Sequence, residues 1–145
     1  MVPQENNYFE QINRLTNSAW QPLLDLISEI KSTREFGDMK GGEKREDGRI
    51  TMPYWVESST VSKFRGLAYR LDIIISFDWA SWDEGRAILS NQNFDFNSID
   101  IPTKCKLITA IVRNDRFSEG ALVETFESGL MLQILESINT QLAKK

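Results

Sequence analysis

The chain has 145 residues, of which 17 are Lys or Arg and 21 are Asp or Glu, so its formal net charge is −4. This length predicts one domain. It contains no histidine and one cysteine, Cys105, which excludes a Ser-His-Asp or Cys-His nucleophilic site, a Cys/His zinc site and an intrachain disulfide within this chain. A lone cysteine is typical of a reducing compartment, so the sequence predicts a cytoplasmic protein without metal or cofactor.

Charge and hydropathy disfavour two classes of partner. Domains that bind nucleic acid usually carry a positive patch, whereas the densest basic stretch here, residues 40–49, is matched by acids. The longest apolar runs are a few residues, such as 73–75, while a membrane span needs about 20. The chain does not begin with a positively charged stretch followed by an apolar run, so a signal peptide is not expected. The sequence therefore predicts no membrane partner.

The first part of the chain, residues 5–33, is predicted to be helical. Ser18 is a candidate N-cap of a second helix, and Pro22 would lie near its first turn, where a missing N–H is tolerated. The apolar residues that recur at helical spacing are Tyr8, Phe9, Ile12, Leu15, Trp20, Leu23, Leu24, Ile27 and Ile30.

The second part, residues 34–49, is predicted to be a mobile charged linker. It holds five basic and five acidic residues, and four of the eight glycines of the chain. Its apolar residues are Phe36 and Met39 alone. Such a segment buries too little apolar surface to offset the entropy of ordering, which favours a loop.

The third part, residues 50–142, is denser. The stretch 50–56 has extended character, although Pro53 interrupts it. Ser58 or the serine after it is expected to cap the next helix. Ser81 and Glu84 have the spacing of a capping box, which predicts a short helix through residue 89.

Three further signals place the last helices. Pro102 suits the first turn of a helix, and Ser118 is a candidate cap for the next one. Gly129 is expected to break or kink the final apolar run. Because nearly every periodicity is helical, the sequence predicts an all-α, single-domain bundle of about six or seven short helices, with one short extended segment near 50–56.

Two motifs resemble known sites and fail on detail. Gly37 and Gly42 have the spacing of a phosphate-binding loop, but Glu43 follows where a lysine is needed. Glu124 and Glu127 match the first carboxylate pair of all-α nucleotide pyrophosphatases, which hold magnesium, but the second pair of that class does not follow. A solvated linker and a solvated helix face are the favoured interpretations.

The aromatic segment 77–83 contains Trp79 and Trp82, three residues apart, which would share one face of a helix. These rings would stack on a base or sugar, or would lie in the core, and the second use is favoured because aromatic side chains supply much of the buried area of a small bundle. Asp78 lies between two aromatic residues, and a carboxylate in such surroundings needs an arginine or a helix N-terminus as its partner.

The segment 106–120 carries the sharpest hypothesis. Arg113 and Arg116 are three residues apart after an apolar helix, and Asp115 and Glu119 are four apart beside them. They are expected near a corner between two helices. Because Arg116 has Asp115 on one side and an aromatic residue on the other, its side chain is expected to be partly buried.

Two roles are open for this corner. The two arginines would clamp a phosphate or carboxylate. Alternatively, they would pair with nearby acids in a polar network that holds the corner, and this structural role is favoured. The candidate ligand-binding residues are Arg113, Arg116, Asp115, Glu119, Asp78, Trp79 and Trp82.

The segments 77–82, 106–120 and 126–130, together with Met-Pro-Tyr at 52–54, resemble an uncharacterised bacterial family, one of the domains of unknown function. The resemblance covers roughly residues 52–138. It implies a bacterial or phage-related intracellular protein, and it implies no reaction, ligand or catalytic residue.

The leading prediction is a non-enzymatic interaction or regulatory module with a protein partner. Self-association is included, because amphipathic N-terminal helices beyond a mobile linker would pack on a second copy. The alternative is a small anionic-ligand-binding protein or enzyme that uses Arg113 and Arg116 with nearby acids, and nucleic-acid binding through the tryptophans is the weakest hypothesis. The composition leaves a carboxylate-only or magnesium-dependent enzyme open.

Overall fold

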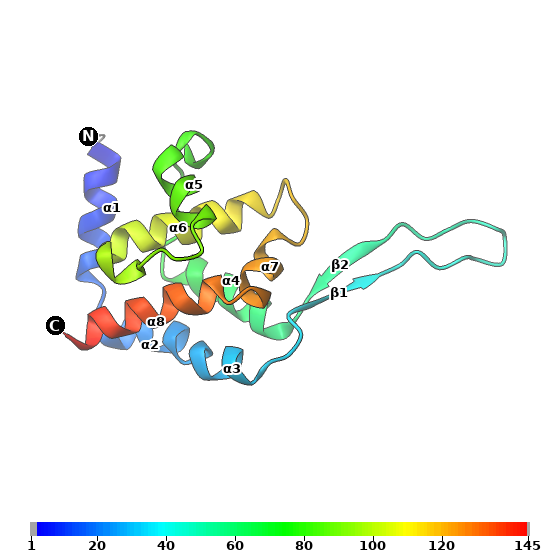
Figure 1. Cartoon of the computed structure of the whole chain (residues 1–145), viewed down its shortest axis with the longest axis horizontal. Coiled ribbons are helices and arrows are strands. Elements are labelled where there is room, and N and C mark those ends of the chain that lie inside the picture. The colour runs from blue at the N-terminus through cyan, green and yellow to red at the C-terminus, as the bar shows by residue number, and fades with distance from the viewer. Residues whose placement is uncertain (1–2, 145) are drawn as a thin grey trace.

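The computed structural model describes residues 3–144, with the side chains of residues 3–6 and 55 left out. Within this range the chain is mostly helical, as predicted (Figure 1). The structure describes eight α-helices, and Asp25 alone separates α2 from α3, so that these two form one interrupted helical segment. The α-helices are α1 (Pro3–Arg14), α2 (Asn17–Leu24), α3 (Leu26–Ser32), α4 (Ser59–Arg70), α5 (Asp83–Ser90), α6 (Ile101–Asn114), α7 (Ala121–Glu127) and α8 (Leu130–Ala143), with short 3-10 helices η1 (Trp79–Ser81) and η2 (Phe96–Ser98).

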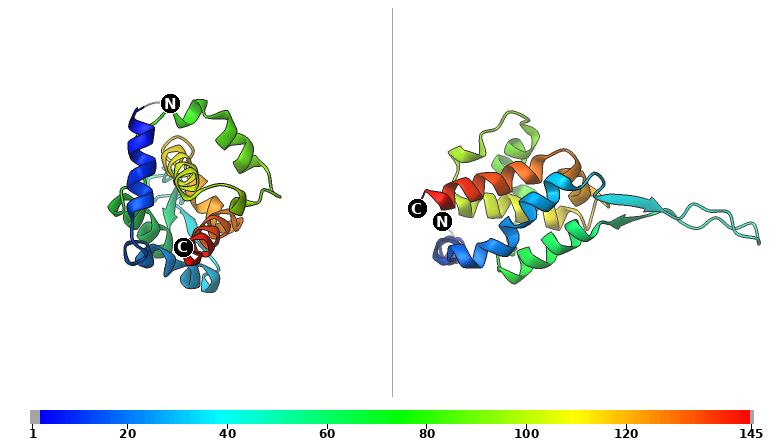
Figure 2. Two further views of the ribbon diagram at one scale, coloured as in Figure 1. Left: turned by 90° about the vertical axis from the view of Figure 1, so that its left-hand side faces the viewer. Right: turned by 90° about the horizontal axis from the view of Figure 1, so that it is seen from below.

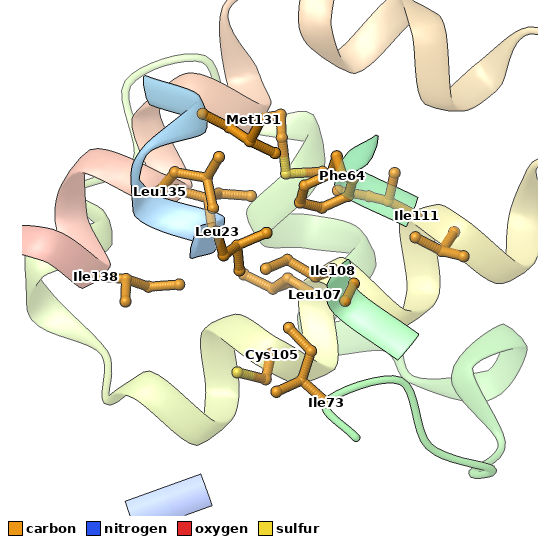
Figure 3. Close-up of a cluster of buried hydrophobic side chains, with 14 of the residues drawn as sticks. Leu23, Phe64, Ile73, Cys105, Leu107, Ile108, Ile111, Met131, Leu135 and Ile138 are labelled. Carbon is orange, nitrogen blue, oxygen red and sulfur yellow. The ribbon is translucent and has the colours of Figure 1, made fainter. Parts of the chain in front are cut away.

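Helix α6 is the centre of the bundle. Eleven of its 14 residues are buried, because it packs against α1, α5, α7 and α8. Pro102 lies in its first turn, as predicted. The N-cap is Asp100, which accepts a hydrogen bond from the Thr103 N–H (2.8 Å). Figure 3 shows the core around it, to which other helices contribute Leu23, Phe64, Met131, Leu135 and Ile138.

The N-terminal helices belong to this core. Tyr8 and Ile12 of α1 are buried, as are Trp20 and Leu23 of α2, which packs against α4 and α8. The Tyr8 hydroxyl donates to the Ile73 carbonyl (2.6 Å) and ties α1 to the segment after α4. The apolar faces that the sequence offered for packing on a second copy are therefore occupied within one chain.

A buried lysine links α6 to the C-terminal helix. Lys104 is fully buried, and its Nζ donates to Ser137 Oγ (2.6 Å) and to Gln141 Oε1 (2.5 Å) of α8. Ser137 donates in turn to Asn97 Oδ1 (2.7 Å), which brings η2 into the same network. Burial lowers the pKa of Lys104 to about 8, although the negative charges of Asp100 and Asp95 oppose this shift.

Several helix ends differ from their predicted positions. Ser58 caps α4 as expected, but Thr16 rather than Ser18 caps α2. Helix α7 begins after Gly120, so Ser118 is not its cap. Gly129 does break the last apolar run, because its positive φ of 86° ends one helix before α8 begins.

A two-stranded arm projects from the bundle (Figures 1 and 2). Strand β1 (Gly37–Lys40) pairs antiparallel with β2 (Tyr54–Glu57), with Gly37 opposite Glu57 and Lys40 opposite Tyr54. Hydrogen bonds between the two sides continue toward the tip, where the Thr51 N–H donates to the Glu43 carbonyl (2.9 Å).

Strand β2 confirms the extended segment expected near 50–56. The prediction that residues 34–49 form a loop without a strand was wrong, because β1 lies inside that segment. Its extended conformation is held by pairing with residues 14 to 20 positions away along the chain, and local composition carries no signal of that partner. The mobility of 34–49 stays a prediction. Among the helices the structure describes, none is long and apolar enough to cross a membrane.

Candidate functional site

The two candidate arginines lie at the corner after α6, but they are not alike. Arg113 is half-buried, with its guanidinium carbon 5.8 Å from the centre of the Tyr69 ring on α4. Arg116 is exposed, so the expectation that it is partly buried was wrong. Helix α6 ends at Asn114, and Arg116 lies in the turn that follows, with its side chain exposed.

The polar network of the corner is built on a different arginine, Arg65 of α4. Its Nη2 donates to Asp115 Oδ2 (3.0 Å) and to Glu57 Oε2 (2.8 Å), and the three side chains are only 20–29% exposed. Asp115 also accepts from the Leu122 N–H in the first turn of α7 (3.0 Å). The Glu57 carboxylate, assisted by Asp115, raises the pKa of Arg65.

This arrangement assigns Asp115 a structural role. It joins α4, the end of β2 and the start of α7, so an acid–arginine network holds the corner. The favoured interpretation expected Arg113 and Arg116 to supply the cations, whereas the cation bound to Asp115 is Arg65. The sequence did not indicate Arg65 or Glu57 as members of this network, because Arg65 lies 50 residues from Asp115 along the chain.

The two remaining candidate acids, Asp78 and Glu119, are both exposed. Asp78 is exposed and lines a cleft on another part of the surface, beside α1. Glu119 is exposed in the turn between α6 and α7. The structure therefore does not gather the seven candidate residues into one site.

Two clefts flank Trp82. The first, of about 880 Å³, lies between α5 and the helices α6, α7 and α8, and Trp79, Trp82 and Glu124 are among its lining residues. The second, of about 790 Å³, lies beside α1 and is lined by Asp78, Trp82 and Lys106 among others. Trp79 and Trp82 are half-buried, and Trp82 packs on the edge of the core rather than inside it.

Trp82 lines both clefts and separates them, and its ring is closely packed by neighbouring residues. The Nζ of Lys106 lies 4.6 Å from the centre of a Trp82 ring and 5.0 Å from that of Phe77, and the two rings meet edge to face. Gly85, in the first turn of α5, lies against the ring, and a Cβ there would come within 2.2 Å of it.

Gly85→Ala is expected to lower the free energy of unfolding by about 1–3 kcal/mol, because the added methyl would overlap the Trp82 ring and force the wall to move. Chemical unfolding monitored by tryptophan fluorescence measures the effect. Gly66→Ala is the matched control: it lies in α4 with open space around its Cβ position, so it should stabilise the protein by about 0.5–1 kcal/mol. A Gly85 variant as stable as wild type would contradict the close packing.

The arm carries most of the exposed apolar surface. Among the residues whose side chains are described, seven large hydrophobic residues are exposed, and five of them lie on the arm. These five are Met39, Ile50, Met52, Tyr54 and Val56. The other two, Tyr69 and Phe117, lie near the corner, where Phe117 packs on Trp79 with ring centres 6.1 Å apart.

Comparison with known proteins gives one match. The model of a family of unknown function, DUF6508, matches residues 15–144. The chain belongs to the DUF6508 family. The match confirms the expected family of unknown function, and it extends beyond residues 52–138 to include the arm and helices α2 and α3. No curated protein matches the chain, and no solved structure does.

Three observations describe the candidate chemical groups of this DUF6508 chain. Arg113 and Arg116 line neither of these two clefts. Among the described side chains, no three His, Cys, Asp or Glu residues are grouped so that they could hold a metal ion. Cys105 is fully buried, and burial raises the pKa of its thiol, which keeps it protonated.

Proposed function

We propose that this DUF6508 chain is a non-enzymatic module for protein–protein association and that the arm is its contact element. The observation that carries the proposal is an apolar stripe on the second side of the arm. It consists of Ile50, Met52, Tyr54 and Val56, and the first two side chains are 69% and 82% exposed.

The spacing of the stripe supports a binding surface. Tyr54 and Val56 are alternate residues of β2, so their side chains point to the same face of the strand. Ile50 and Met52 continue the same alternate spacing along the chain toward the tip of the arm. Water-exposed apolar side chains scattered singly are common, but a contiguous group on a projecting element is typical of an interaction site. The helices bury their own apolar faces, so the folding of the bundle does not require this stripe.

The charge of the arm favours a protein over nucleic acid. Residues 37–57 hold four basic side chains (Lys40, Lys44, Arg45 and Arg49) and five acidic ones (Asp38, Glu43, Glu46, Asp47 and Glu57). Binding to a phosphate backbone draws its affinity from an excess of Lys and Arg. A nearly neutral surface with apolar side chains suits a protein interface.

Two further points belong to the proposal. A cytosolic setting is supported by the free cysteine at position 105. A small-anion function receives less support, because Arg113 rests on an aromatic ring and neither candidate arginine lines either of the two clefts beside Trp82.

Photocrosslinking in the cell tests the proposal. A photoreactive amino acid at Met52 is expected to give discrete covalent adducts with one or a few proteins, and Ile50→Glu should reduce their yield by at least about tenfold if the stripe is buried in the complex. The same group at Asn139, which is exposed on α8, is the matched control. Equal adduct patterns from Met52 and Asn139, or adducts unaffected by Ile50→Glu, would overturn the proposal.

A further inference from the structure

Strand β1 is an open edge. The sheet has two strands only, so one side of each strand has no partner within the described residues. At the base of the arm the Ser58 N–H donates to the Phe36 carbonyl (2.9 Å). In an antiparallel ladder, residues whose N–H and C=O groups bond to the partner strand alternate with residues whose groups point the other way. Because Phe36 bonds to the β2 side, the peptide groups of Gly37 and Met39 in the paired segment point away from β2, toward the open edge.

An isolated two-stranded ribbon is marginally stable in water, and three or more strands are usually needed. The arm extends beyond the helices in Figure 1 and in the right-hand view of Figure 2, so the helices do not cover the edge along the projecting part of the arm. An uncovered edge with outward peptide groups is a template for another strand.

We propose that the open edge of β1 pairs antiparallel with β1 of a second copy, about a twofold axis at Met39. This rests on the proposed function, because it names a partner for the same arm. The resulting sheet has four strands, in the order β2, β1, β1, β2. In this register Asp38 lies opposite Lys40 of the second copy, and Lys40 lies opposite its Asp38, so both charge pairs are satisfied at once.

The charges select this register. A twofold axis at Asp38 would place two aspartates opposite each other, and an axis at Lys40 would place two lysines opposite each other, which is unfavourable. Within one chain Asp38 and Lys40 form only an exposed pair, with Nζ and Oδ2 3.5 Å apart. Their side chains are therefore accessible to the second copy.

The geometry of the arm limits the pairing to a short segment. Gly37 packs against Val123 at the base, and Gly41 adopts a positive φ of 85° immediately after the strand. The two bundles lie at opposite ends of the shared sheet, because the paired strands run in opposite directions. The apolar stripe is on the β2 side of each arm, so pairing along β1 leaves it open to another protein.

Sedimentation equilibrium of the full chain, from micromolar to millimolar concentration, tests the inference. Wild type is expected to dimerise, and Asp38→Lys should raise the dissociation constant by at least about tenfold, since it turns both opposite-charge pairs into like-charge pairs. The charge-swapped double variant Asp38→Lys with Lys40→Asp should restore the dimer. Met39→Pro should abolish it, because proline removes an N–H that points to the open edge.

Each result has a defined meaning. A wild-type chain that stays monomeric, an Asp38→Lys variant that dimerises as wild type does, or a double variant that does not recover would overturn the inference. Ile50→Glu is expected to leave the dimer intact, because that residue belongs to the stripe. If Ile50→Glu abolishes the dimer and Asp38→Lys does not, the second copy binds the stripe, so the inference fails while the proposed function stands. Circular dichroism checks that each variant is folded.

Discussion

Asp115→Ala is expected to lower the free energy of unfolding by about 2–4 kcal/mol, the range for losing one partner of a largely buried ion pair together with a helix cap. The carboxylate of Asp115 accepts from Arg65 (3.0 Å) and from the Leu122 N–H (3.0 Å). Its removal leaves the start of α7 without that acceptor and leaves the Arg65 guanidinium with Glu57 alone. Reversible urea unfolding measures the loss.

Arg116→Ala is the matched control for this prediction. Arg116 follows Asp115 in the chain but is exposed, so its replacement should change stability by no more than about 0.5 kcal/mol. Arg65→Ala should destabilise the protein as Asp115→Ala does, and the double variant should cost less than the sum of the two. If Arg116→Ala proves as costly as Arg65→Ala, the assignment of the network to Arg65 is wrong.

The second large effect is a pH dependence of stability that originates at Lys104. The pKa of this lysine is about 8 in the folded protein, against 10.5 as its ordinary value. Between these two values the unfolded chain binds more protons than the folded chain, so the free energy of unfolding rises with pH. At about 1.4 kcal/mol for each pKa unit, the contribution of Lys104 amounts to about 3 kcal/mol across this interval.

Two other buried groups act in the opposite direction. Burial raises the pKa of the Cys105 thiol and of the Tyr8 hydroxyl above their ordinary values of 9.0 and 10.0. The unfolded chain loses these protons first, so both groups lower stability as the pH rises above those ordinary values. The rise due to Lys104 is therefore visible directly only between about pH 8 and 9.

Lys104→Met isolates the lysine, because Cys105 and Tyr8 are present in both proteins. The difference in unfolding free energy, wild type minus variant, should increase by about 1 kcal/mol between pH 8 and pH 9, because the folded-state lysine is already half deprotonated at pH 8. Urea unfolding at a series of pH values gives this difference. A difference that stays constant with pH would show that Lys104 is not desolvated in the folded protein.

The helical part of the fold follows from local sequence rules. Apolar residues at helical spacing identify the inner faces, and Asp100 with Pro102 marks the start of α6 because a side-chain acceptor and a fixed φ act within one turn. The exclusion of His-dependent and disulfide chemistry also needs only the composition. The cap of α7 was misplaced, since Gly120 and not Ser118 precedes it.

The candidate site was predicted only in part. Asp115 was identified as a member of a corner network, but its partner is Arg65 and not the neighbouring arginines. Sequence proximity favoured Arg113 and Arg116, whereas the side chain that reaches the carboxylate comes from α4. The arm was missed for a related reason, because a charged, glycine-rich segment has no strand pattern until its partner strand is present.

The sequence by itself determined the helices, the family and the chemistries that lack the necessary residues, because periodicity, motifs and composition are local properties. Only the tertiary structure decided that the N-terminal helices join the core, that Arg65 holds the corner and that the apolar stripe projects from the bundle. Each of these depends on segments that are far apart along the chain and meet in space. Their energies come from burial, ion pairing and strand pairing between those segments, which no local pattern records.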